Sequence, residues 1–353
     1  MKKTLVALAA LSAVSVFAQS SVTVFGTVDP SIRSQTINMV GGLSSSQTFL
    51  GNNGQGTTQV SFRGVEDLGG GLKAHFLVEN DINVTDGRGV GVTAAGVATS
   101  VSALGSGGGE LYAGIEGGFG RLLLGTPNTP SLLVQAGRQP YGTKIGSGFG
   151  GVMGSAHVRE VGSVVYWTPN FSGFYAGLSY TPEVNAFETA NPALIAGTLG
   201  TAGPLPTAKS KVDLGLFYNN GPLGAGLSFY QQEGAQKQVN LFGTYAFGPA
   251  KIFLGFHTQN NDTNPLAVDN TGWNVALNYS VTPTLDLSFN YGSLDDKLAA
   301  NLDRKIGALG VKYSLSKRTS VYGKYVSETN DNVVAAGGVT DIRTFLVGVQ
   351  HNF

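Results

Sequence analysis

The segment 273–291, WNVALNYSVTPTLDLSFNY, alternates large apolar side chains with small or polar ones on both sides of a central Thr-Pro-Thr. Successive side chains of an extended strand point to opposite faces, so this pattern predicts two strands, each with one apolar and one polar face. The apolar face must be covered by a protein core or by lipid. The apolar row consists of Trp273, Val275, Leu277, Tyr279, Leu285, Leu287, Phe289 and Tyr291.

The same alternation recurs along the chain, and no segment after residue 20 shows a convincing helical period. We predict sixteen strands, each close to the roughly 9–11 residues that cross a membrane when a strand is tilted. Seven tight turns alternate with eight long loops, which sorts turns and loops to opposite ends of the sheet, as in an up-and-down barrel. The tight turns are predicted at 67–70, 117–120, 169–170, 220–222, 248–249, 282–284 and 316–317, and the long loops include 34–56, 83–108, 127–159 and 183–208.

The width of such a barrel decides between core and lipid. Barrels of about 16–18 strands leave an aqueous channel, so one apolar residue in every two positions cannot fill the interior. With the apolar rows turned outward to lipid, the polar rows line water and the closed ring pairs every backbone group. The low share of charged residues, 12%, agrees, because a Lys or Arg facing lipid at mid-membrane costs about 2–4 kcal/mol. We therefore predict an all-β, 16-stranded antiparallel transmembrane β-barrel with short turns and long loops.

The alternation also assigns faces to individual residues. In the strand 249–258, Ile252 and Phe253 compete for the lipid side, and the sequence leaves that choice open. Charged residues expected on the inner face are Lys73, Asp213, Asp286, Lys312 and Lys324. Aromatic residues near strand ends are expected to form interfacial girdles; they are Tyr166, Trp167, Phe171, Tyr180, Tyr218, Tyr230, Phe247, Trp273, Tyr279 and Tyr291.

The first residues differ from the rest of the chain. Lys2 and Lys3 precede a short apolar run that ends at Ala18, with small residues at the cleavage positions. This arrangement predicts a secretory signal peptide over 1–18 and an exported chain over 19–353. The sequence has no cysteine, so disulfides do not contribute to the stability of the exported chain.

The final strand carries a second export-related pattern. Phe345, Val347, Val349, His351 and Phe353 share one face, with His351 the least apolar member. An alternating apolar row that ends in Phe resembles the assembly signal of bacterial outer-membrane barrels. This resemblance implies that Phe353, Val349 and Val347 are recognised by the barrel-assembly machinery.

Several segments together resemble the general porins of β-proteobacterial outer membranes, in order along the whole exported chain. The resemblance implies a homotrimer in outer-membrane lipid and lipopolysaccharide, with periplasmic turns, extracellular loops and one water-filled pore per subunit. It also implies that 127–159 folds into the pore as a constriction and that 83–108 reaches a neighbouring subunit. The segments are SVTVFGTVD (21–29), FRGVEDLGGGLKAHFLVE (62–79), GIEGGFGRLLLGT (114–126), SVVYWTPNFSGFYAGLSY (163–180), LSKRTSVYGKY (315–325) and GVQHNF (348–353).

The candidate constriction carries an unusual set of charges. Relatives have an Arg where this chain has Gln59 and often a cation near Glu110, and their constriction loops usually carry carboxylates, whereas 127–159 contains no Asp or Glu. Fixed charge in a narrow tunnel changes the local concentration of permeating ions. We expect passive diffusion of small hydrophilic solutes and ions with a weak anion preference, opposed by Glu79, Asp81 and Glu110. The cations expected at the constriction are Arg63, Lys73, Arg138, Lys144 and Arg159, with His157 nearby.

Catalytic and cofactor sites are not expected. The four histidines lie in separate segments without metal-ligand spacing. Residues 146–151, GSGFGG, fit a dinucleotide fingerprint but neither follow a strand nor open a helix, so we interpret them as a folded loop. One cluster of oxygen-bearing side chains is either part of an ordinary solvated loop or a calcium site. It consists of Asp81, Asn83, Thr85 and Asp86. No enzyme activity, cofactor, metal or nucleic-acid partner is expected.

Two other functions stay open at this point. One is a channel selective for a sugar, a phosphate or an organic acid, which would show saturable permeation. The other is a non-conducting barrel that acts as an adhesin or a receptor. The polar inner rows and the lack of a plug domain argue against the second alternative.

Overall fold

The computed structural model describes residues 21–85, 88–89, 108–149, 151–152, 157–185, 207–261, 268–298, 302–333 and 338–353. The predicted signal peptide, 1–18, and most of the predicted inter-subunit loop, 83–108, lie outside the described residues. Within the described part of the chain, no helix is both long enough and apolar enough to span a bilayer.

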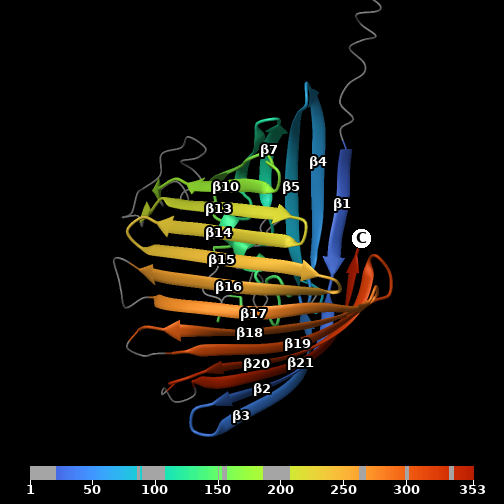
Figure 1. Cartoon of the computed structure of the whole chain (residues 1–353), viewed down its shortest axis with the longest axis vertical. Helices are drawn as coiled ribbons and strands as arrows, with labels where there is room; N and C mark the ends of the chain where they lie inside the picture. Colours follow the sequence, from blue (N-terminus) through green and yellow to red (C-terminus); the bar gives the residue numbers. More distant parts are fainter. Residues whose placement is uncertain are drawn as a thin grey trace, which may run out of the picture.

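The described strands form one antiparallel ring of sixteen wall strands (Figure 1). β1 (Ser21–Val28) and β2 (Pro30–Met39) are two parts of the first wall strand, and β3 (Leu43–Asn52) and β4 (Gln59–Gly69) are parts of the second. The wall continues through β5 (Leu72–Asn83), β7 (Leu111–Gly117), β8 (Gly120–Thr126), β9 (Ser163–Trp167), β10 (Phe174–Thr181), β13 (Lys211–Asn220), β14 (Leu223–Gln232), β15 (Gln236–Phe247), β16 (Ala250–Asn261), β17 (Asp269–Thr282), β18 (Leu285–Asp296), β19 (Arg304–Ser314), β20 (Thr319–Asn330) and β21 (Val339–Asn352).

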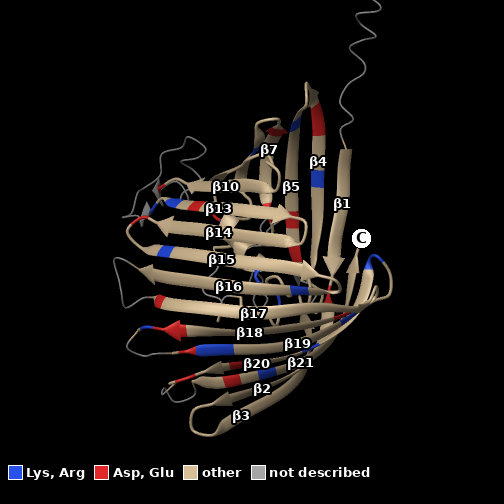
Figure 2. Ribbon diagram, in the orientation of Figure 1, with Lys and Arg blue, Asp and Glu red and all other residues tan. Residues whose placement is uncertain are grey.

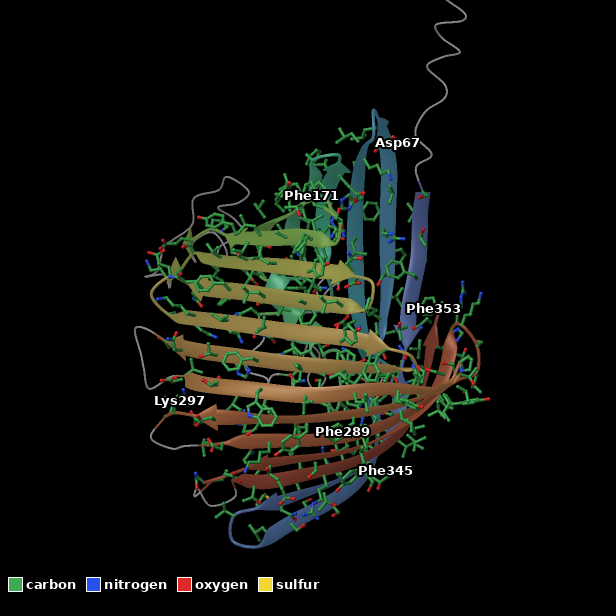
Figure 3. All side chains as sticks on the ribbon, viewed as in Figure 1. Asp67, Phe171, Phe289, Lys297, Phe345 and Phe353 are labelled. Atoms are coloured by element: carbon green, nitrogen blue, oxygen red, sulfur yellow. The ribbon has the colours of Figure 1, made fainter. Side chains whose placement is uncertain are left out.

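Three short strands lie outside this wall. β6 (Arg88–Gly89) adds two residues to the edge of β5, and β11 (Val184–Asn185) pairs with β12 (Thr207–Ala208). The tight turns predicted from the sequence and the longer connecting loops lie at opposite ends of the barrel. Figure 3 places Asp67 at the turn between β4 and β5, and Lys297 at the loop end of β18.

The ring closes between the first and last wall strands. β21 pairs with β20 on one side and with β2 on the other. The backbone N–H of Gly26 donates to the carbonyl oxygen of Phe353 at 3.2 Å, and the Phe353 N–H donates back at 3.1 Å. Figure 3 shows Phe353 at the lower end of β1. Closure leaves the barrel without the unpaired edges that make open sheets associate.

The predicted faces are correct in the strands of segment 273–291. Trp273 is 46% exposed on the outside, whereas its neighbour Asn274 is 2% exposed on the inside. The open choice in the preceding strand is also resolved, because Ile252 faces outward and Phe253 is buried on the inner face. Figure 2 shows long uncharged stretches along β13–β18, with charged residues mainly near the strand ends.

The segment 34–56 is not the long loop that the sequence predicts. β2 extends to Met39 and β3 begins at Leu43, so only three residues separate the two strands. Gly41 and Gly42 have φ values of 89° and 76°, which glycine adopts without steric cost, and this permits the tight turn. A second connection is also short, since β14 and β15 are joined by residues 233–235. The alternation of turns and long loops is therefore not strict.

Two predicted girdle aromatics face the inside of the barrel. Trp167 is in register with Gly177 and Arg121 and is buried, and Tyr230 is fully buried beside Asp213. The prediction was wrong for both, because position near a strand end does not determine the face. Trp167 belongs to an apolar cluster inside the barrel, which consists of Leu123, Val134, Val165, Trp167, Phe217 and Phe242.

Candidate pore constriction

A short helix enters the barrel directly after β8. This helix, α2 (Pro130–Gly137), begins after Thr129, whose Oγ1 accepts a hydrogen bond from the Leu132 N–H at 3.2 Å. Thr at the N-cap and Pro at the first helical position are favoured helix starts. No helix is predicted here from the helical period of the sequence, although the Thr-Pro-Ser start followed by Leu-Leu-Val is a signal that indicates one.

The apolar side of α2 packs on the apolar cluster of the inner wall. Val134 is fully buried among Leu123, Val165 and Trp167. Leu133, one residue earlier, is 39% exposed on the other side of the helix. Burial of an aliphatic side chain of this kind contributes roughly 1.5–3 kcal/mol. The locally apolar inner wall of β8–β15 is therefore the surface on which α2 packs.

Polar wall residues hold the start of α2. The Ser131 N–H and Oγ–H both donate to the Asp213 carboxylate, at 3.1 and 2.8 Å. The N-terminal end of a helix carries partial positive charge, so a carboxylate is favourable there. One turn later, Gln135 Nε2 donates to Asn240 Oδ1 at 3.3 Å. These bonds attach the helix to β13 and β15.

Arg138 does not line the water-filled space. Its side chain is completely buried, and Nη1 donates to the Phe256 carbonyl oxygen at 3.4 Å. Asn274 Nδ2 donates to the Arg138 carbonyl oxygen at 2.7 Å. Burial lowers the pKa of Arg138 to about 9. The sequence placed this cation at the constriction, but the loop folds it against β16 and β17.

The segment 139–149 continues along the inner wall. Tyr141 Oη donates to the Ser288 carbonyl oxygen at 3.0 Å, and Asn290 Nδ2 donates to the Gly146 carbonyl oxygen at 2.9 Å. Gly146 and Gly148 have φ values of 97° and 72°, so this glycine-rich stretch forms turns. Tyr141 packs with Val152 of the same loop and with four apolar inner-face residues, namely Leu294, Ile306, Ala308 and Val326.

The loop returns to the wall beside its starting point. The Thr129 N–H donates to the Val158 carbonyl oxygen at 3.0 Å. His157 Nε2 lies 3.1 Å from Gln236 Nε2, and Glu160 forms an ion pair with Lys211. Glu160 was not among the predicted site residues, and its position after the loop gave no sequence signal for this role.

The pKa of Glu160 is lowered despite its partial burial. Burial alone raises this pKa, but hydrogen bonds from His157 and Lys211 lower it by more. The Tyr230 hydroxyl also donates to Glu160 Oε1 at 3.3 Å. Glu160 is therefore ionised at neutral pH and anchors the end of the loop.

Three predicted site residues meet around Glu79, on the wall beside the first and last residues of the loop. Gln59 Nε2 donates to Glu79 Oε1 at 2.9 Å, and the Glu110 N–H donates to Glu79 Oε2 at 3.0 Å. Glu110 Oε1 accepts from the Asn128 N–H at 2.7 Å, and Arg159 Nη1 donates to Asn128 Oδ1 at 2.9 Å. Gln59, Glu110 and Arg159 are thus linked through one hydrogen-bond chain.

Lys144 approaches this group from the loop. Burial lowers its pKa, and the charge of Asp81 acts in the opposite direction while Arg159 reinforces the lowering. Burial raises the pKa of Glu110, with the nearby Glu79 adding to the effect and the Asn128 N–H opposing it. Groups of both signs therefore face each other where the loop meets the wall.

Arg63 and Lys73 lie further along the wall. Arg63 is four residues from Gln59 on β4, and its guanidinium carbon lies 5.7 Å from the centre of the Phe25 ring. Lys73 is in register with Asp67 and Glu116, near the tight turns. At about 3.4 Å per residue, Lys73 is roughly 27 Å along β5 from Asp81. Lys73 therefore lies at the tight-turn mouth and not beside the loop.

A second inward segment, 53–58, was missed because the sequence read it as part of a long loop. Asp29 Oδ2 accepts from the backbone N–H groups of Gln55 and Gly56, both at 2.6 Å. Lys324 Nζ donates to the Gly54 carbonyl oxygen at 2.8 Å. Asp29, between β1 and β2, therefore holds this segment against the inner wall.

Neither of the two proposed ligand motifs is described in full. Asp86 and Gly150 lie outside the described residues, so the calcium cluster and the 146–151 motif are each incomplete. Among the residues that the structure does describe, no three His, Cys, Asp or Glu side chains are arranged to hold a metal ion.

The sequence matches a known protein family over most of its length. The family described as Gram-negative porin matches residues 4–333. Outer membrane porin protein 32 of Delftia acidovorans is 30% identical to this chain, and the alignment covers all of both chains.

Two solved structures have the same fold. The anion-selective porin from Comamonas acidovorans superposes with a TM-score of 0.73 at 27% identity, covering 95% of this chain and all of that chain. The trimer form of OmpT, an outer membrane protein of Vibrio cholerae, superposes with a TM-score of 0.63 at 15% identity, covering 95% and 99%. At 15% identity the second likeness shows the fold alone.

Proposed function

Because this chain belongs to the Gram-negative porin family, we propose that segment 127–159 narrows its channel and sets which solutes pass. The protein is a transmembrane β-barrel channel of the outer membrane. Small hydrophilic solutes and ions diffuse through it passively, and the narrowing gives them a size limit and a weak preference for anions.

The observation that carries this proposal is the attachment of the loop to the inner wall. Ser131 is bonded to Asp213 on β13, and Gly146 is bonded to Asn290 on β18. Contacts to strands this far apart keep 127–149 inside the ring over several wall strands. A segment held across the inside of a barrel reduces the cross-section available to solutes.

Charge at the same place supports the anion preference. Segment 127–159 contributes Lys144 and ends at Arg159, and it has no carboxylate of its own. Glu79, Asp81 and Glu110 lie close to these cations and oppose them, so the preference is weak. The related Comamonas porin is anion-selective, so its ion preference has the same sign as the one proposed here.

The assembled form is proposed from the family. We infer a homotrimer in which 83–108 reaches a neighbouring subunit, and a signal peptide that is removed after residue 18. OmpT, which shares the fold, occurs in a trimer form. Chemical cross-linking of the protein in outer membranes tests the homotrimer. Mass determination of the single chain tests the removal of residues 1–18.

Recognition by the assembly machinery is proposed for the outward row of β21. Val347, Val349 and Phe353 are exposed on the outer face. His351, the polar member of the row, has Nδ1 2.9 Å from the Thr319 hydroxyl. The neighbouring strand therefore satisfies this imidazole, and the row stays largely apolar. A Phe353→Ser variant is expected to accumulate less folded protein in outer membranes.

Planar-bilayer recording tests the main proposal. We expect stepwise ohmic conductance and, in a tenfold KCl gradient, a reversal potential whose sign reports more permeant chloride than potassium. Liposome swelling with sugars of increasing size should show a sharp decline without saturation. Cation selectivity would refute the anion preference alone, whereas no conductance from folded protein would refute the channel proposal.

A solute-selective channel remains a second candidate because of one side pocket. The space between the loop and β20, β21 and β2 measures about 270 Å³. Its charged lining is Arg33, Lys144 and Glu328, which together suit a small organic acid that also carries a donor. Permeation that saturates with one such solute and competes with chloride current would favour this candidate.

A further inference from the structure

Lys324 connects the two segments that fold into the barrel. It lies on β20, and its side chain is 3% exposed. Its Nζ donates to the Gly54 carbonyl oxygen at 2.8 Å and to the Ile145 carbonyl oxygen at 3.0 Å. Gly54 belongs to the inward segment 53–58 and Ile145 to the loop 127–159, so one ammonium group bonds both.

Two aromatic rings enclose the same ammonium. Nζ lies 4.5 Å from the centre of the Tyr141 ring and 5.8 Å from the centre of the Tyr322 ring. Both rings are themselves fixed, because Tyr141 Oη donates to the Ser288 carbonyl oxygen and Tyr322 Oη donates to Asp29 Oδ1. A cation over a desolvated ring is stabilised by the electrons of the ring face. The two rings and the two carbonyl oxygens therefore hold the Lys324 side chain in one position.

The contacts continue into the backbone of segment 53–58. Asp29 accepts from Tyr322 and from the N–H groups of Gln55 and Gly56. Gly54 has no room for a side chain, since an added Cβ would lie 2.3 Å from Tyr322 Oη. The inward segment, the wall and the loop thus form one packed group around Lys324.

The cost of burying an ammonium indicates a positioning role. A buried charge is unfavourable unless it is bonded, and a neutral side chain of similar volume would fill the same space without that cost. What an apolar side chain cannot provide is donors to two carbonyl oxygens on different segments. Lys supplies three such donors from one point.

We propose that Lys324 is a positioning residue that clamps the tip of loop 127–159 to segment 53–58 and thereby fixes the aperture of the channel. The inference rests on the proposed function of that loop as the constriction. It assigns Lys324 an effect on aperture and loop motion, in addition to the general effect of a positive charge inside the barrel.

The test compares Lys324→Met, Lys324→Arg and Lys312→Met in the full-length protein. Lys312 is the matched control, because it is also an inner-face cation on the adjacent strand but pairs with Asp286 at 3.2 Å. Lys324→Met and Lys312→Met remove the same charge, and only the first removes the clamp. Lys324→Arg keeps the charge and the donors.

Three readouts separate the clamp from charge and from stability. For Lys324→Met we expect more open-channel current noise, a swelling limit shifted to larger sugars, and amide exchange in 141–149 and 53–58 faster by roughly tenfold to a hundredfold. For Lys312→Met we expect altered ion selectivity with unchanged noise, swelling limit and exchange. Lys324→Arg should restore wild-type behaviour in part.

Several results would overturn the clamp. They are wild-type noise, swelling and exchange in Lys324→Met, or the same changes in Lys312→Met. If Lys324→Met does not fold, Lys324→Leu, which also removes both the charge and the donors, takes its place under the same criteria. A wild-type protein that folds but does not conduct would defeat the proposed function itself, whereas a conducting wild type with an unaffected Lys324→Met variant defeats the clamp only.

Discussion

The imidazole ring of His157 stacks on the phenol ring of Tyr230, with the ring centres 3.4 Å apart and the planes 10° apart. His157 Nδ1 also lies 3.6 Å from Glu160 Oε1. This stack fixes the returning end of the loop to the inner face of β14. The loop is therefore held at both of its ends, at Ser131 by Asp213 and at His157 by Tyr230 and Glu160.

Acid should loosen this returning end. The pKa of Glu160 is lowered in the folded protein, so its stabilising effect is present above the unfolded pKa of about 4.3 and is lost as the pH falls further, through the folded pKa. We expect channel noise to rise below about pH 4, measured in bilayers from pH 7 downwards. Glu160→Gln should be noisy at every pH, while Glu183→Gln, which removes an exposed ion pair with Lys209, should match the wild type.

Neighbouring positions on α2 should respond differently to the same change. Val134→Asn puts an amide into the apolar cluster, at a cost of about 1–3 kcal/mol, whereas Leu133→Asn leaves the amide in water. We expect Val134→Asn to raise the swelling limit and Leu133→Asn to keep it. Equal effects of the two variants would contradict the inferred packing of α2, in which Val134 contacts the wall and Leu133 does not.

Selectivity should depend on position along the channel. Lys144→Glu reverses a charge where the loop meets Asp81, so we expect the reversal potential to change sign toward cations. Lys73→Glu makes the same change near the tight-turn mouth, and its effect should be several times smaller. Reversal potentials in a KCl gradient measure both, and a larger effect of Lys73→Glu would place the narrowest point elsewhere.

Ring closure should be sensitive to volume at Gly26. An added Cβ there would lie 2.2 Å from the Gln59 carbonyl oxygen and 2.6 Å from the Phe353 ring. Gly26→Ala should therefore lower the free energy of unfolding by about 1–3 kcal/mol, the usual cost of overpacking. Gly243→Ala is the control, because no atom lies within 4 Å of its added Cβ. Urea unfolding in detergent micelles compares the two.

The sequence determined the wall because alternation is a local property. Where it was ambiguous, as at Ile252 and Phe253, the register decided: Ile252 pairs with Leu277 on the lipid face and Phe253 with Ala276 on the inner face. The hairpin of β2 and β3 was missed because it lacks a clear apolar alternation. Its outer face is largely polar, with Ser44 and Ser46 in place of large apolar residues, so it carries no lipid-facing row.

The constriction was less predictable, because a loop has no period from which to read a face. Arg138 and Lys144 are six residues apart in the same polar segment, yet the first is buried against β16 and the second faces Asp81. The backbone path that separates them depends on distant tethers such as Asn274 and Asn290. Lys324 was correctly placed on the inner face, but its two carbonyl partners come from segments far away in the sequence.

The bonds between Gly26 and Phe353 join the first wall strand to the last one. The seam of the cylinder cannot be sealed until both parts are present together. An incompletely closed barrel would expose two unpaired strand edges, which can pair with the edges of other incompletely folded chains. Closure of this seam is therefore the step at which the cylinder loses its last free strand edges.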